Sequence, residues 1–226
     1  MRPILLIQRD VPEPDRDGLR IEPAGNRQAT YLAAKRLCDI AGGLLLLVIC
    51  SPLMVLVTLL LAVTTRGRPI YCQSRVGYCG RTFTMFKFRT MRPNADSQQH
   101  VVTNEMDGPV FKNRRDPRVT RIGRWLRTLS VDELPQLFNV LAGHMSLVGP
   151  RPPLMKEVLC YEPWQRRRLA VKPGLTCLWQ VSGRNEVGFD DWVRMDLWYV
   201  DNQHLLTDLK LLARTPSIVL SRRGAY

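Results

Sequence analysis

The longest hydrophobic segment of the chain runs from Ile40 to Val63 and contains no charged residue. As an α-helix, with a rise of about 1.5 Å per residue, it is long enough to cross a hydrocarbon layer of roughly 30 Å. A helix of this length in a soluble core normally keeps one polar face. The pattern therefore predicts a helix that lies in a membrane.

The centre and the flanks of this segment refine that prediction. Ser51 and Pro52 lie near its middle, where proline removes a backbone hydrogen bond and favours a kink. Basic residues flank it on both sides, namely Lys35, Arg36, Arg66 and Arg68. Because such residues favour the cytoplasmic side, we expect a re-entrant membrane helix-break-helix over residues 31–68 that enters and leaves by one face. A straight span is the alternative, and it would place residues 1–35 outside the cell.

The rest of the chain divides into a tail and a larger region. Residues 1–30 contain four prolines and no periodicity, which indicates a flexible N-terminal tail. Alternation over residues 70–91 predicts one or two short strands, and residues 92–117 are interpreted as a loop. Apolar spacing predicts helices over residues 118–129, 130–141, 154–164 and 205–212. The predicted fold class is mainly α with a small β component, in which a cytosolic α/β domain over residues 69–226 follows the membrane helix.

The charge balance points to an anionic partner. The 33 Lys and Arg residues outnumber the 20 Asp and Glu residues, which gives a formal net charge of +13. Nucleic acid, an anionic membrane surface and a phosphorylated substrate are the candidates. We expect no nucleic acid, because the chain has no corresponding binding signature and the uncharged segment would stay unexplained. The arginines of residues 118–129, with Trp125, suit either a helix at lipid headgroups or a solvated face over an ordinary core.

The most informative polar stretch runs from Ser130 to Gln136 and contains the adjacent acids Asp132 and Glu133. Ser130 and Glu133 fit a capping box, and acids suit a helix N-terminus, so a structural role explains them. The same geometry also suits chemistry, because a helix N-terminus binds phosphate. One carboxylate could attack phosphorus while its neighbour holds Mg²⁺, which prefers hard oxygen ligands. Both interpretations stay open on these residues alone.

Basic residues in two further motifs are candidates for phosphate binding. Lys87 and Arg89 flank one bulky apolar residue, and Arg151 lies between two prolines that restrict its backbone. Arginine binds phosphate oxygens with a bidentate fork, although a surface salt bridge explains either motif equally well. A third stretch, residues 172–185, combines turn residues, amides and a cation that suit a nucleoside or a sugar. Its Trp179 is interpreted as a core residue.

In combination, these motifs resemble those of the bacterial sugar transferases, a family of monotopic polyprenyl-phosphate phosphoglycosyl transferases. The resemblance covers roughly residues 32–226. It rests on these motifs in order: Lys35-Arg36, Ser51-Pro52, Lys87-Phe88-Arg89-Thr90-Met91, Asp116-Pro117-Arg118-Val119-Thr120, Leu129-Ser130-Val131-Asp132-Glu133-Leu134-Pro135-Gln136 and Met145-Ser146-Leu147-Val148-Gly149-Pro150-Arg151-Pro152. Two positions depart from the family pattern, since Cys177 replaces a glycine and Gln203-His204 replaces Trp-Ser.

The resemblance implies a catalytic domain that transfers a hexose-1-phosphate from a UDP-sugar to undecaprenyl phosphate and releases UMP. Such an enzyme is expected in the lipid bilayer of the bacterial inner membrane, at its cytoplasmic face, in the first membrane step of exopolysaccharide, capsule or O-antigen synthesis. Residues 182–185 and 224–226 resemble members that transfer galactose-1-phosphate, while glucose-1-phosphate stays open. The resemblance is also compatible with a homodimer.

Residue by residue, the resemblance implies that Asp132 is the nucleophile of a covalent phosphosugar intermediate and that Glu133 binds Mg²⁺. Lys35 and Arg36 are expected at the headgroups, near the lipid phosphate. The other substrate contacts are expected from Lys87, Arg89, Arg118, Arg151, Gln180 and Arg184. The alternative is a non-catalytic scaffold that docks on an anionic membrane through its basic residues.

Overall fold

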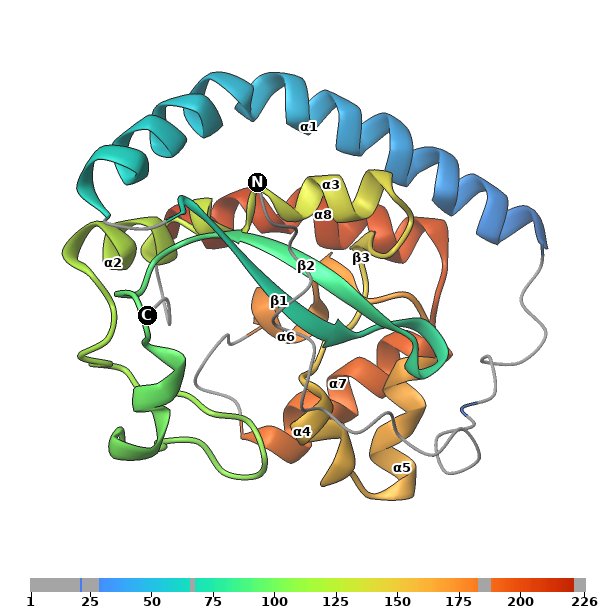
Figure 1. Ribbon diagram of the computed structural model, residues 1–226. Helices are drawn as coiled ribbons and strands as arrows, with labels where there is room; N and C mark the ends of the chain where they lie inside the picture. Colours follow the sequence, from blue (N-terminus) through green and yellow to red (C-terminus); the bar gives the residue numbers. More distant parts are fainter. Residues whose placement is uncertain (1–20, 22–28, 66–67, 183–187, 222–226) are drawn as a thin grey trace.

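The computed structural model describes residues 21, 29–65, 68–182 and 188–221. It is mainly helical and contains two small β-sheets, which confirms the predicted fold class at that level (Figure 1). The tail expected over residues 1–30 lies outside the described residues, apart from Ile21, Ala29 and Thr30.

Helix α1 (Ala29–Thr64) is 36 residues long and arches over one side of the molecule (Figure 1). It continues through Ser51 and Pro52, so the structure has one curved helix where the sequence predicted two helices separated by a break. Pro52 has no N–H to donate to the carbonyl of Val48, four residues earlier. The Ser51 hydroxyl donates to that carbonyl instead, at 2.9 Å, and this satisfies the acceptor without ending the helix.

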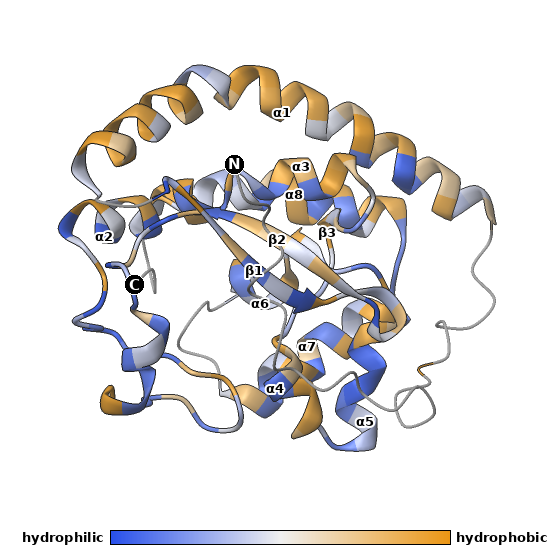
Figure 2. Ribbon diagram, in the orientation of Figure 1, coloured by the Kyte–Doolittle hydropathy of each residue, from blue (hydrophilic) through white to orange (hydrophobic). Residues whose placement is uncertain are grey.

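The two faces of α1 have different environments. Its inner face packs on the rest of the molecule through Gly43, Met54, Val57 and Leu61, which are buried. Its outer face is apolar and exposed, as hydropathy colouring shows (Figure 2). The most exposed side chains there include Leu37, Val48, Ile49, Leu56, Leu59 and Val63. By length and composition α1 could cross a membrane, and so much exposed apolar surface indicates membrane association.

An antiparallel hairpin forms the larger of the two sheets. Strands β1 (Ile70–Val76) and β2 (Thr82–Phe88) pair along their full length and are joined by the 3₁₀ turn η1 (Tyr78–Gly80). This confirms the strands predicted over residues 70–91. Phe83 and Met85 of β2 are buried on the face that also carries Lys87, and Phe88 is buried on the opposite face. Both faces of β2 therefore contribute to the core, in two different clusters.

A short parallel pair forms the second sheet. Strands β3 (Ser146–Val148) and β4 (Gly174–Thr176) contain three residues each, too few for the periodicity that predicts a strand. Gly174 permits a close approach of the two segments, because a Cβ there would lie 2.0 Å from the backbone nitrogen of Gly149.

The remaining helices are mostly short. In chain order they are η2 (Asp96–Val101), α2 (Arg121–Thr128), η3 (Val131–Glu133), α3 (Gln136–Leu141), α4 (Met155–Leu159), α5 (Pro163–Arg166), η4 (Arg167–Ala170), α6 (Leu178–Ser182), α7 (Phe189–Asp201) and α8 (Leu205–Ser221). The helices predicted over residues 118–129 and 205–212 are confirmed as α2 and α8. Each of the other two predicted helices is divided by a turn, and α7 was not predicted.

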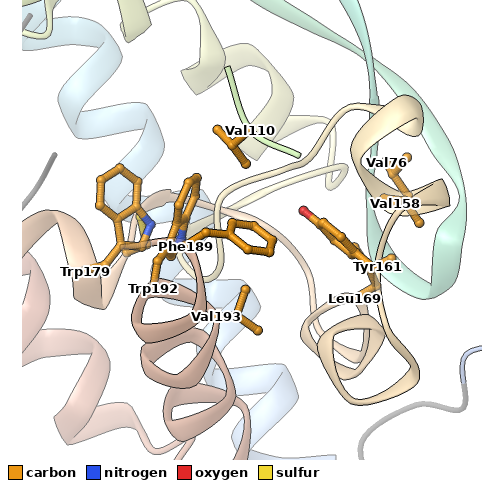
Figure 3. Packing of buried hydrophobic residues seen from close by; sticks show 10 residues of the cluster. Val76, Val110, Val158, Tyr161, Leu169, Trp179, Phe189, Trp192 and Val193 are labelled. Carbon is orange, nitrogen blue, oxygen red and sulfur yellow. The ribbon is translucent and has the colours of Figure 1, made fainter. Parts of the chain in front are cut away.

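Buried apolar side chains form three clusters. The first joins α4, α6 and α7 and includes the indoles of Trp179 and Trp192, so the interpretation of Trp179 as a core residue is confirmed (Figure 3). The second lies between β2, α3, β3 and α8. The third packs the C-terminal half of α1 against Phe88 and Leu126. Helix α1 is therefore part of the packed structure.

Candidate active site

Polar residues from distant segments line one cleft of about 340 Å³. Its walls come from the β1–β2 hairpin, residues 89–118, α2, η3, the turn after β3, α4 and α6. Both acids proposed from the sequence contribute to this cleft, as do the predicted substrate-binding residues Lys87, Arg89, Arg118, Arg151 and Gln180. The tertiary structure thus gathers most of the predicted site in one place.

The acid pair, Asp132 and Glu133, lies on the single turn η3, just before α3. Ser130 precedes it with a left-handed backbone (φ 55°), and its side chain makes no capping hydrogen bond. The predicted capping box is therefore wrong, because an N-cap residue normally has extended backbone angles. The turn leaves Asp132 only 7% exposed while it still lines the cleft.

Helix α3 holds this turn against strand β2. The Asn139 side chain accepts from the Phe86 N–H at 3.1 Å and donates to the Thr84 carbonyl at 2.7 Å. This double contact fixes the helix beside the strand that carries Lys87. Lys87 Nζ then donates to Glu133 Oε1 at 2.6 Å.

The two acids have different proton affinities. Burial alone would raise the pKa of Glu133, but the charges of Lys87 and Arg151 outweigh it and hold this pKa below its ordinary range. For Asp132, burial and the adjacent charge of Glu133 raise the pKa, against the opposing effect of Lys87 and Arg127. Glu133 is therefore the member of the pair that stays ionised at neutral pH.

Arg127 of α2 is a cleft residue that the sequence argument did not identify. Its Nε donates to Thr90 Oγ1 at 3.0 Å. Burial lowers the pKa of Arg127, and the negative charge of Asp132 opposes that effect. The sequence feature that could have indicated Arg127 is the arginine at every third position of residues 118–127. Spacing alone could not tell Arg127, which faces the acids, from the exposed Arg121 and Arg124.

Arg151 lines the cleft, and its backbone is held in place by neighbouring residues. Its backbone carbonyl accepts from Arg168 Nη2 at 3.3 Å, and the neighbouring Pro152 carbonyl accepts from Arg75 at 3.0 Å. Within the described part of the chain, no ion pair or hydrogen bond engages its guanidinium. A fixed backbone with free guanidinium donors suits a phosphate group.

Arg89 and Arg118 also line the cleft, but their guanidinium groups already have protein partners. Arg89 Nε donates to the Arg68 carbonyl at 2.7 Å, and the guanidinium lies 5.9 Å from the centre of the Tyr71 ring. Arg118 is buried and binds Asp116 through Nη2 at 2.7 Å and Nε at 2.9 Å. Such a buried bidentate pair stabilises the loop around it, and the substrate contact expected from Arg118 stays a prediction.

Lys35 and Arg36 fasten α1 to the domain, and neither is among the described residues that line the cleft. Lys35 Nζ donates to Asp208 at 2.9 Å, to the Tyr199 hydroxyl at 3.2 Å and to the Val148 carbonyl at 3.1 Å. Arg36 donates to the last two carbonyls of α3 at 2.7 Å each, a common contact at helix C-termini. Both side chains thus have intramolecular partners where the resemblance implied lipid headgroups.

Gln180 and Arg184 were the remaining predicted substrate contacts. Gln180 Oε1 accepts from the backbone N–H of Cys177 at 3.1 Å, which leaves its amide NH₂ group to donate into the cleft. This contact shapes the turn around Cys177. Arg184 lies outside the described residues, so its role stays a prediction.

The acid pair fits a magnesium ion when the substrate supplies further oxygens. The described residues contain no group of three or more His, Cys, Asp or Glu side chains able to hold a metal alone. Mg²⁺ is usually held by one or two carboxylates together with substrate phosphates. Because Lys87 engages Glu133 Oε1, the other carboxylate oxygen of Glu133 is the available ligand.

Comparison with known proteins identifies relatives of this chain. The family model described as bacterial sugar transferase matches residues 30–222. The chain is 44% identical over 200 residues to the galactosyl transferase CpsE of Streptococcus agalactiae serotype III, covering 87% of this chain and 44% of that protein. It is 46% identical over 201 residues to the undecaprenyl-phosphate galactose phosphotransferase of Salmonella typhimurium, covering 85% of this chain and 41% of that protein.

A third relative has a length closer to that of this chain. The exopolysaccharide production protein ExoY of Sinorhizobium fredii is 41% identical over 199 residues, covering 85% of this chain and 88% of ExoY. The chain thus spans less than half the length of the first two relatives and most of the length of the third.

Proposed function

Because the chain belongs to the bacterial sugar transferase family, we propose that it transfers a hexose-1-phosphate from a UDP-sugar to undecaprenyl phosphate and releases UMP. The observation that carries this proposal is the acid pair, in which Asp132 has a raised pKa and Glu133 a lowered one. Lys87, Arg127 and Arg151 add positive charge to the same cleft. Cations that neutralise phosphate while a carboxylate attacks it suit reaction at a diphosphate.

Asp132 is the proposed nucleophile. One of its carboxylate oxygens attacks the phosphorus that carries the sugar, and the bond from this phosphorus to the bridging oxygen breaks. The electron pair leaves with UMP, and an acyl phosphate joins Asp132 to the sugar phosphate. Burial supports this role, because a poorly solvated carboxylate is reactive once ionised, and Lys87 and Arg127 favour its ionised form.

Undecaprenyl phosphate is the proposed acceptor in the second half-reaction. One of its phosphate oxygens attacks the same phosphorus, and the Asp132 carboxylate leaves as the free group. The products are the lipid diphosphate sugar and the original enzyme. Since UMP departs before the acceptor reacts, we expect ping-pong kinetics.

Magnesium, when bound, would neutralise diphosphate charge. Glu133 would hold it through the oxygen that Lys87 leaves free, and phosphate oxygens of the donor would complete the ligand set. We expect a chelator to abolish UMP release and added Mg²⁺ to restore it. The melting temperature of the protein without substrate should change little on chelation, because the donor supplies part of the ligand set.

We also propose that α1 is a re-entrant helix in the cytoplasmic leaflet of the bacterial inner membrane. Two observations support this: its inner face packs on the domain, and Lys35 ties its first turns to Asp208. A straight span would break these contacts. Cysteines introduced near residues 20 and 70, in a chain without its natural cysteines, should both resist an impermeant thiol reagent applied from outside intact cells. Labelling of one position alone would contradict re-entry.

Galactose-1-phosphate is the proposed group, since two of the relatives are named for galactose. Glucose-1-phosphate is the second candidate. The purified full chain, incubated with undecaprenyl phosphate, Mg²⁺ and a panel of UDP-sugars, should release UMP fastest with UDP-galactose. Failure to release UMP with any sugar would refute the enzyme and favour the non-catalytic scaffold.

A further inference from the structure

Lys112 has an environment that the reaction described above does not use. Asn104 Oδ1 accepts from its backbone N–H at 2.8 Å and so fixes this part of the loop. The Lys112 side chain places Nζ 4.8 Å from the ring centres of both Trp179 and Trp192. These two indoles lie side by side (Figure 3), and Lys112 and Trp179 both line the cleft.

Two buried donors on residues that line the cleft lack acceptors. Lys112 Nζ and Trp179 Nε1 are both inaccessible to solvent, and neither has a hydrogen-bond partner in the described part of the chain. The indole faces attract the ammonium group, but they supply no acceptor oxygen. Because buried polar groups are nearly always hydrogen-bonded, the pair points to a ligand rich in acceptor atoms.

The charges around Lys112 indicate that this ligand is an anion. Burial, and then the charge of Arg151, lower the pKa of Lys112 to about 7. The titratable groups that face it are Arg151, Cys177 and Glu157, with the buried Arg168–Asp196 ion pair behind Trp192. An anion placed between Lys112 and Arg151 would relieve the repulsion between them and favour the protonated amine.

We propose that Lys112, together with Arg151, binds the phosphate on the nucleoside side of the donor's diphosphate, which leaves as part of UMP. Arg151, Glu133 and Lys112 line the same cleft, and the charge of Arg151 acts on both of the other groups. If the sugar-bearing phosphorus lies beside Asp132, the other phosphate of the donor's diphosphate would lie near Arg151 and Lys112. This assignment rests on the proposed transferase function.

The role of Lys112 is specific to the first half-reaction. When the phosphorus–oxygen bond breaks, the electron pair and its negative charge pass to the bridging oxygen that UMP carries away. The Lys112 ammonium donates a hydrogen bond to this phosphate and stabilises the added charge. A neutral Lys112 takes up a proton from solvent as UMP or the donor binds. UMP has left before the lipid reacts, so the second half-reaction does not need Lys112.

The two half-reactions can be measured separately in the full-length chain. Exchange of labelled UMP into UDP-galactose, without lipid, reports the first, and discharge of the isolated adduct to undecaprenyl phosphate reports the second. We expect Lys112→Met to slow exchange and weaken UMP binding about 10- to 100-fold, the loss expected for one charge-assisted hydrogen bond. Discharge should change less than twofold. Lys156→Met is the matched control, because Lys156 is exposed and binds Gln99.

Proton uptake gives a readout that a purely structural role would not change. Calorimetric titration of UMP at pH 8, in buffers of different ionisation enthalpy, should show a fraction of a proton taken up by the natural chain. Lys112→Arg should keep part of the UMP affinity and show no uptake, because guanidinium stays protonated. This variant also retains a cation between the indoles, so it tests the proposal even if Lys112→Met folds poorly.

The outcomes distinguish a failure of the Lys112 assignment from a failure of the proposed transferase function. If the natural chain exchanges UMP, and Lys112→Met exchanges and binds it equally well, Lys112 does not hold the leaving phosphate and the transferase function stands. Equal proton uptake by the natural chain and Lys112→Arg would also overturn the assignment. If the natural chain exchanges no UMP with any UDP-sugar, the proposed function itself is wrong.

Discussion

Lys87 Nζ lies 2.6 Å from Glu133 Oε1, and this contact gives two adjacent carboxylates, Asp132 and Glu133, different proton affinities. Lys87 comes from β2 and Glu133 from η3, so only the packing of α3 on the hairpin brings them together. The pKa of Glu133 is lowered and that of the neighbouring Asp132 is raised. A metal ligand has to stay ionised, whereas a nucleophile benefits from a higher basicity, so the pair divides these two tasks.

Replacement of the nucleophile should remove activity without removing stability. Asp132→Asn keeps the size of the side chain but cannot form the acyl phosphate, so we expect UMP release to fall at least about 1,000-fold. A carboxyl whose pKa is raised on folding favours the folded state more as pH falls through that pKa, and costs stability above it. The variant should therefore be more stable at pH 7, by about 1 kcal/mol or more.

Mass spectrometry and thermal unfolding check this prediction together. The natural chain should show a phosphosugar adduct on Asp132 after incubation with donor alone, and Asp132→Asn should show none. Asp191→Asn, a change of an exposed acid on α7, should form the adduct normally. Normal turnover by Asp132→Asn, or an adduct on another residue, would contradict the assignment.

Loss of the ammonium partner of Glu133 should change both stability and pH dependence. Lys87→Met leaves the partly buried Glu133 without its closest cation, which should destabilise the protein by about 1–3 kcal/mol at pH 7. The lowered pKa of Glu133 contributes stability above its unfolded-state value, and that contribution is lost as pH falls through the folded-state value. The variant should show a smaller acid-dependent loss, because Arg151 still lowers the pKa of Glu133.

The pH profile of UMP release gives a second test of Lys87. Lys87 also lowers the pKa of Asp132, so its removal should shift the acidic limb of the first half-reaction to higher pH. An unchanged limb in Lys87→Met would show that another group controls it. Lys156→Met, at an exposed lysine, should leave both the profile and the stability unchanged.

Two arginines of the cleft should respond differently to the same substitution. Arg151→Met removes a guanidinium with no ion-pair partner in the described part of the chain, so it should weaken UMP binding at least tenfold with little change in stability. Arg118→Met leaves Asp116 buried and unpaired and should destabilise by about 3–5 kcal/mol. Binding and denaturant unfolding of both variants make the comparison. The reverse ranking would show that Arg118 is the phosphate contact.

Lys35 should act on stability through Asp208. Lys35→Met leaves this buried carboxylate without its cation and should cost about 3–5 kcal/mol, whereas the double variant with Asp208→Asn should recover part of the loss. Unfolding in one detergent measures the single and double variants as a cycle. A lipid headgroup contact predicts the opposite pattern, in which lipid affinity falls, stability is kept and Asp208→Asn brings no recovery.

Local features of the chain were enough to predict much of the fold. The uncharged segment led to α1, alternation led to the β1–β2 hairpin, and apolar spacing led to α2 and α8. These elements are long enough for a period to show. The three-residue strands β3 and β4 are too short for this, and the divided helix over residues 154–164 depended on a turn that periodicity does not detect.

At Ser51 and Pro52, a local side-chain hydrogen bond offsets the helix-breaking effect that the proline predicts. Proline predicts a break because it removes one hydrogen bond of the helix. The Ser51 hydroxyl satisfies the carbonyl of Val48 that would otherwise lack its partner, and α1 stays continuous. The curvature of the helix over the domain then follows from the packing of its inner face.

By itself, the sequence determined which chemistry-bearing residues are present: an acid pair, several cations and one apolar helix. Only the tertiary structure decided which cations face the acids, because side chains on a common motif point in different directions once the chain packs. It directed Lys87, Arg127 and Arg151 into the cleft and Lys35 and Arg36 into the base of α1. Burial and charge proximity depend on residues far apart in the chain, and these set the different proton affinities of Asp132 and Glu133.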